Sequence, residues 1–197
     1  MQPQLEQLIG EYSEHLTIEY CMGGLIPDWT EFSDPLNSIH KPAQMAPMWM
    51  QAGHLTGRSI DDMIWISDPP SSSFPACIAV KTAQLQSPEA GKHMLLRLSE
   101  AVMENGRNIS KTAIIAEVAE GLARDRPEIF SFDHFKKEYN GDLSREAFRQ
   151  DLKRVKLHKI GRFPTITIIS AKGHGVLITG YRPYKALLEA IRQVVPL

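Results

Sequence analysis

The sequence has few cysteines and no pattern of metal-ligating residues. Its two cysteines, Cys21 and Cys77, are far apart and form no Cys-x-x-Cys motif, which excludes a disulfide framework and a zinc ribbon. No two of the seven histidines are four residues apart, and the sequence contains no His-Glu-x-x-His motif. We therefore expect no metal site and no bound cofactor.

The sequence also has no large net charge and no long apolar run. The formal net charge is −1, so there is no electrostatic reason to expect nucleic acid or an anionic membrane surface as a partner. No apolar run reaches the roughly 20 residues of a membrane span. The first residues, Met1–Glu6, lack the basic and apolar parts of a signal peptide. We expect a cytoplasmic globular protein, and the sequence leaves its oligomeric state open.

Apolar periodicity predicts a mostly helical chain with strands near both ends. Residues 3–15 follow helical spacing, and Leu16–Met22 follows as a short strand. Residues 25–42 contain several prolines and are predicted to be irregular. Further along the chain the predicted elements are helices at 43–55, 75–85, 130–139 and 144–157, two helical stripes within 94–122, strands at 165–169 and 176–180, and a helix that begins at 182.

The helix that begins at Pro75 places Cys77 in its first turn. A helix dipole lowers the pKa of a thiol there, which would make Cys77 a reactive cysteine. The neighbouring Ala76 and Ala79 favour the other interpretation, a small buried residue on the apolar side of the helix. Both interpretations stay open at this point, whereas Cys21 lies within a predicted strand and is expected to be inert.

Phe163-Pro164 stands directly before the β-branched strand that starts at Thr165. Proline cannot donate a hydrogen bond to a β-ladder, so it is tolerated where a strand begins. The run from Thr165 to Ile169 has the composition of such a strand. This dipeptide is therefore the best candidate in the chain for a structured, cis X-Pro turn at the edge of a site.

Short motifs spread over the whole chain resemble the DsbA family of dithiol-disulfide oxidoreductases, in the branch called predicted dithiol-disulfide isomerases. Each motif is weak, but their order and spacing together are specific. The matching pieces are Pro3-Gln4-Leu5, Gly23-Gly24-Leu25, Met45-Ala46-Pro47-Met48-Trp49, Thr56-Gly57, Trp65, Asp68-Pro69-Pro70-Ser71-Ser72, Pro75-Ala76-Cys77-Ile78-Ala79-Val80-Lys81, Asn108-Ile109, Phe148, Asp151-Leu152, Phe163-Pro164-Thr165 and Gly180-Tyr181-Arg182-Pro183-Tyr184.

The resemblance implies an α/β, thioredoxin-like fold with a large helical insertion. Residues 1–24 and 160–197 would form an incomplete thioredoxin-like subdomain, and residues 25–159 the connection and the helical insertion. Pro164 takes the role of the cis-proline that faces the redox dithiol, and Phe163, Pro164 and Thr165 form the substrate-binding side of the site. Trp65 is a further candidate, for the wall of the pocket. The implied substrate is a protein or peptide that carries a thiol or disulfide, paired in an extended conformation with the backbone of Phe163.

The sequence departs from the family at its start, where the family has a β-strand followed by Cys-x-x-Cys. Here Met1 falls in the first turn of the helix that follows this motif, so no catalytic residue can be named. The missing strand is central in the fold, and its loss would leave two inner edges with unpaired backbone groups. Three explanations are open: a gene that starts upstream of Met1, new pairing among the remaining strands, or a strand supplied by a partner. We expect the first.

The predicted function is that of a DsbA-like thiol-disulfide oxidoreductase or isomerase, in a truncated chain without its redox dithiol. Whether this chain is an enzyme stays open, and as given we expect it to be inactive. A first alternative is a non-catalytic peptide-binding or adaptor module on the same fold. A second is a relative of the kappa-type glutathione transferases and isomerases, whose active serine or cysteine would also lie in the absent segment.

Overall fold

The structure is a computed structural model that describes residues 2–12 and 14–194. Contacts between residues divide the chain into two compact units. The terminal unit comprises Met1–Tyr20 and Arg154–Leu197, and the helical unit comprises Cys21–Lys153. Within residues 2–12 and 14–194, no helix is both long enough and apolar enough to cross a membrane.

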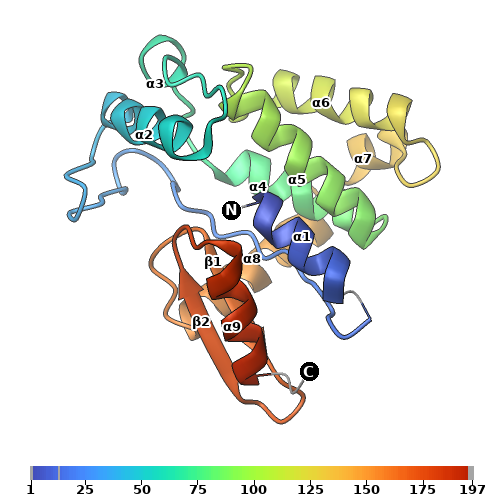
Figure 1. Cartoon of the computed structure of the whole chain (residues 1–197). Helices are drawn as coiled ribbons and strands as arrows, with labels where there is room; N and C mark the ends of the chain where they lie inside the picture. Colours follow the sequence, from blue (N-terminus) through green and yellow to red (C-terminus); the bar gives the residue numbers. More distant parts are fainter. Residues whose placement is uncertain (1, 13, 195–197) are drawn as a thin grey trace. The chain divides into compact units, whose positions relative to one another are not determined.

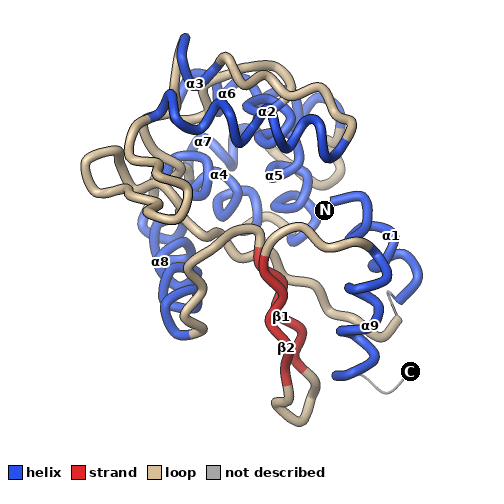
Figure 2. The backbone as a smooth tube through the Cα atoms, turned by 60° about the vertical axis from the view of Figure 1, so that its left-hand side comes forward, coloured by secondary structure: helices blue, strands red, loops and turns tan. Residues whose placement is uncertain are grey.

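The terminal unit is built on a two-stranded hairpin (Figures 1 and 2). The strands pair antiparallel, with Thr165 opposite Thr179 and Ile169 opposite Gly175. Isoleucines at alternate positions of the hairpin pack with apolar residues of both helices around a buried core that contains Leu8. The elements of this unit are α1 (Gln2–Tyr12), β1 (Thr165–Ile169), β2 (Gly175–Thr179) and α9 (Tyr184–Val194).

The helical unit contains the remaining elements. Helix α4 begins at the position that the serine and proline residues of the sequence indicate. Ser73 precedes the helix, and Pro75 occupies its first turn. Helix α5 begins after Ser87, whose hydroxyl accepts a hydrogen bond from the N–H of Ala90 at 3.0 Å. The elements are the 3₁₀-helix η1 (Pro42–Met45) and the helices α2 (Ala46–Thr56), α3 (Ile64–Ser67), α4 (Phe74–Gln84), α5 (Pro88–Met103), α6 (Thr112–Asp125), α7 (Phe132–Glu138) and α8 (Asp142–Leu157), the last of which continues into the terminal unit.

The predicted strand Leu16–Met22 is wrong, because this segment is irregular in the structure. A strand requires a neighbour with which its N–H and C=O groups can pair. Among the described strands β1 pairs with β2 alone, so no strand is present beside residues 16–22. The predicted hairpin is confirmed, with β2 starting one residue earlier than expected.

Candidate functional site

The turn that leads into β1 brings Phe163, Pro164 and Thr165 together at one end of the hairpin. The Phe163–Pro164 peptide bond is cis. The carbonyl of Pro164 accepts the N–H of Gly180 at 2.9 Å, which closes the hairpin at this end. The hydroxyl of Thr165 donates to the carbonyl of Arg162 at 2.6 Å. These hydrogen bonds fix the turn from both sides.

Phe163 combines an exposed aromatic ring with backbone groups that are open to a partner. Its side chain is 37% exposed. Among the described residues no group bonds to its N–H or C=O. An extended peptide can pair with such backbone groups while a side chain of the peptide contacts the ring. The arrangement is suited to binding a peptide, and none of its three residues is a cysteine.

Trp65 belongs to the helical unit, where it lies in the core. Its side chain is 5% exposed, and its ring meets those of Trp29 and Trp49 edge-to-face at centroid distances of 6.0 and 5.0 Å. The indole N–H of Trp65 is buried without a hydrogen-bond partner among the described residues. Its role as the wall of a substrate pocket stays a prediction.

Cys77 lies in the first turn of α4, as predicted, but its thiol is not activated there. Burial raises the pKa of the Cys77 thiol from 9.0 to about 11. A hydrogen bond from the N–H of Gly24 lowers this pKa, while the nearby Asp151 and Cys21 add smaller increases. Desolvation outweighs the helix dipole, whose effect falls off within one turn and is worth about 0.3–1 kcal/mol at surface sites. The half-buried Cys77 is therefore better explained as an unreactive packing residue than as a reactive cysteine.

Sequence reasoning missed a buried ion pair beside these cysteines. The ammonium of Lys81 lies 3.0 Å from Oδ2 of Asp151, and the two side chains are 7% and 2% exposed. The same Oδ2 accepts the N–H of Met22 at 2.8 Å, and the Cys21 thiol donates to the Asp151 carbonyl at 3.6 Å. One signal was available in the sequence, since Lys81 interrupts a run of small and apolar residues in α4.

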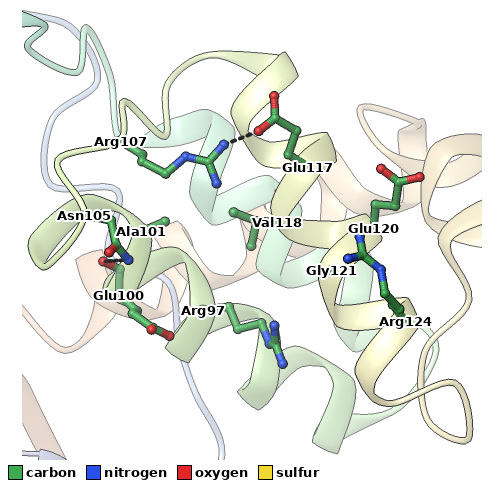
Figure 3. A pocket seen from close by; sticks show the side chains of 10 residues that line it. All are labelled: Arg97, Glu100, Ala101, Asn105, Arg107, Glu117, Val118, Glu120, Gly121 and Arg124. Carbon is green, nitrogen blue, oxygen red and sulfur yellow. Dashed lines mark hydrogen bonds and ion pairs between the residues drawn. The ribbon is translucent and has the colours of Figure 1, made fainter.

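A shallow hollow lies between α5 and α6 (Figure 3). Its wall carries charges of both signs, and Arg107 is ion-paired with Glu117. Arg97 pairs with Asp125 at 2.6 Å. In each pair the acidic side chain neutralises the arginine at the surface. The hollow therefore offers no excess charge to a ligand. Among the described residues, no group of histidine, cysteine and acidic side chains could hold a metal ion.

Comparisons with known proteins agree with this architecture. A family model described as Thioredoxin matches residues 1–189. A solved structure from Nitrosomonas europaea, described as a protein disulfide isomerase, superposes with a TM-score of 0.75 at 23% identity, over 97% of this chain and 87% of the other. The cytosolic disulfide reductase DsbM of Pseudomonas aeruginosa superposes with a TM-score of 0.69 at 18% identity, over 96% and 90% of the two chains. These similarities confirm the expected thioredoxin-like fold with a helical insertion.

The curated relatives are named as adapter proteins and not for disulfide chemistry. The ClpXP adapter protein SpxH of Halalkalibacterium halodurans is 24% identical over 98% of this chain and 62% of its own length. The ClpXP adapter protein SpxH of Bacillus cereus is 25% identical over 99% of this chain and 63% of its own length. The chain thus spans less than two thirds of the length of these relatives. Because the family model covers nearly the whole sequence, the chain belongs to the thioredoxin family.

Proposed function

We propose that this chain is a protein-binding adaptor module, which holds a partner protein without exchanging disulfides with it. The observation that carries the proposal is the turn of Phe163, Pro164 and Thr165, which exposes an aromatic ring and backbone groups that are unpaired within the described residues, and which holds no cysteine. Cys77 does not favour thiol chemistry, because burial raises its pKa to about 11 and leaves the thiol almost entirely protonated at pH 7. The attacking group in disulfide exchange is the thiolate, so this cysteine is a poor nucleophile.

The names of the relatives support the same choice. The curated relatives are named ClpXP adapter proteins, and an adapter needs a surface for its client rather than a reactive thiol. The solved structures named for disulfide chemistry are under 25% identical and support the fold alone. We therefore place the adaptor function ahead of thiol-disulfide exchange.

The proposed binding surface is the turn of Phe163, Pro164 and Thr165. An exposed aromatic ring contributes a large apolar area at little entropic cost, which is typical of residues that dominate interfaces. The open backbone groups of Phe163 would pair with an extended segment of the client. Recognition of this kind does not require a thiol or disulfide in the client. We propose the cytoplasm as its location, where a ClpXP adapter would act.

The experiment co-expresses the chain with the ClpX and ClpP subunits and follows protein half-lives by pulse labelling and mass spectrometry. We expect at least one client protein to be degraded faster when the chain is present. Phe163→Ser should abolish this acceleration. The matched control is Leu157→Ser, which removes another exposed apolar side chain of the terminal unit, 76% exposed, at the end of α8. The proposal would be contradicted if the chain changed no half-life. It would also be contradicted if Phe163→Ser and Leu157→Ser changed the half-lives equally.

A further inference from the structure

Three side chains contact Arg126, which lies directly after the last residue of α6. Its guanidinium lies 2.9 Å from Nε2 of His93 and donates to Oε1 of Glu89 at 2.8 Å. It also donates to the carboxylate of Glu128. Glu89 and His93 belong to α5, whereas Glu128 lies in the connection between α6 and α7. Arg126 therefore links the end of α6 to α5.

The contact between Arg126 and His93 requires an uncharged imidazole ring. A guanidinium has five N–H donors and no acceptor. Nε2 of His93 must therefore accept the hydrogen bond, which places the ring proton on Nδ1. A protonated ring carries a hydrogen on both nitrogens, so Nε2 and the guanidinium would then be two donors that face each other.

Glu89 offers the protonated ring another partner. Its Oε1 lies 3.6 Å from Nε2 of His93, one turn away on the same helix. The same oxygen accepts the hydrogen bond from Arg126. A small rotation of the ring brings Nε2 within hydrogen-bond distance of this carboxylate. Protonation thus exchanges the partner of His93, from Arg126 on the neighbouring element to Glu89 on its own helix.

The charges around His93 are compatible with both states of the ring. Glu89 faces the ring from α5, Arg126 from the end of α6, and Glu128 from the connection to α7. Two carboxylates and one guanidinium sum to a charge of −1, so a positive ring meets no excess of positive charge. Helix α4, which also packs against α5, has Lys81 as its one charged residue, and this lysine is held in the buried ion pair.

Arg126 also anchors the backbone of the segment that follows α6. Its carbonyl accepts the N–H groups of Ile129 and Phe130, each at 3.2 Å. Phe130 is buried, and its ring centroid lies 5.6 Å from that of Phe135 in α7. A change in the partners of the Arg126 side chain should therefore be felt at these two amides.

We propose that His93 is a pH-dependent contact between α5 and the end of α6. The neutral ring holds Arg126 and the connection to α7 in place. Protonation turns the ring to Glu89 and removes one of the three contacts of the guanidinium, so that residues 126–130 become more mobile. Histidine changes its charge between about pH 5 and 8, which sets the range in which the contact responds. The inference goes beyond the proposed function and does not depend on it.

Nitrogen-15 NMR spectra of the His93 ring, recorded from about pH 8 to about pH 5, test the proposal. At the upper end we expect the tautomer with the proton on Nδ1. As the ring is protonated, the amide signals of Ile129 and Phe130 should shift with the same midpoint as the ring. Protection of these amides against hydrogen exchange, corrected for the intrinsic pH dependence of exchange, should fall by about threefold or more when the hydrogen bond is lost.

Two variants separate this contact from other effects of pH. His93→Gln keeps an acceptor for Arg126 but cannot be protonated, so it should abolish the pH dependence at Ile129 and Phe130. The matched control is His54→Gln, which replaces an exposed histidine of α2 in the same unit and should leave that dependence unchanged. A proton on Nε2 of His93 at about pH 8, or amide shifts that persist in His93→Gln, would overturn the proposal.

Discussion

The carboxylate of Asp151 lies 3.0 Å from the ammonium of Lys81, and water reaches neither group to any extent. The pair joins α8 to α4, and Asp151 also accepts the N–H of Met22. Removal of one partner of a buried ion pair leaves an uncompensated charge in the interior. Within the helical unit, the segment at Met22 is thus held to α8 by a contact whose loss would destabilise the fold strongly.

Asp151→Ala should lower the free energy of unfolding by about 3–5 kcal/mol, because it leaves the Lys81 charge and the Met22 N–H without their acceptor. Urea unfolding followed by circular dichroism measures this change. Glu146→Ala serves as the control, since Glu146 pairs with Arg149 at the surface at 3.2 Å and should cost at most about 1 kcal/mol. The double change Asp151→Leu with Lys81→Met should be less damaging than Asp151→Ala alone. Equal costs for Asp151→Ala and Glu146→Ala would refute this account of the pair.

Gly24→Ala should destabilise the helical unit more than Gly57→Ala. Both glycines have positive φ, 57° and 67°, so both substitutions strain the backbone by about 1 kcal/mol. A Cβ on Gly24 would also lie 2.9 Å from Leu152 and 3.0 Å from Phe148, whereas a Cβ on Gly57 would meet nothing within 4 Å. Thermal unfolding of the two variants measures the difference, which we expect to exceed about 1 kcal/mol. Identical melting temperatures would show that the contacts at Gly24 yield without cost.

The Cys77 thiol should titrate with a pKa near 11 when its rate of alkylation by iodoacetamide is followed against pH by mass spectrometry. Because the folded-state pKa lies above the ordinary value of 9.0, the neutral thiol favours the folded state below about pH 9. That contribution should be lost as the pH rises from about 9 to 11, and it should be absent in Cys77→Ala. An alkylation pKa below 8 would restore the reactive-cysteine interpretation.

Local patterns predicted the elements whose determinants are close in sequence. The hairpin followed from the β-branched runs on either side of Gly173 and Gly175, and the start of α4 followed from the serines before Pro75. The segment Leu16–Met22 has the composition of a strand, but a strand also requires a neighbour, which local composition does not reveal.

The candidate site was predictable only in part, for the same physical reason. The turn at Phe163 and Pro164 is a local feature, and sequence alone located it. The contact of Lys81 with Asp151 joins helices that are far apart in the chain, so no local pattern reports it. Burial also decides the pKa of Cys77, and burial depends on what packs over a helix rather than on the position of the residue within it.

The chain should not reduce insulin in the presence of dithiothreitol beyond the rate of dithiothreitol alone, because its two cysteines form no Cys-x-x-Cys pair and the Cys77 thiol is almost entirely protonated at neutral pH. Turbidity of precipitating insulin measures the reaction. Reduction that disappears in Cys77→Ser would establish a catalytic thiol and contradict the adaptor account.

The central claim is that the chain binds a client without thiol chemistry. Its most direct test is the half-life of the fastest-degraded client in cells that express ClpX and ClpP with either the unchanged chain or the double variant Cys21→Ser, Cys77→Ala. The adaptor account predicts the same shortened half-life with both chains. A half-life that returns to its value without the chain, in a double variant that unfolds at the same temperature as the unchanged protein, would contradict it.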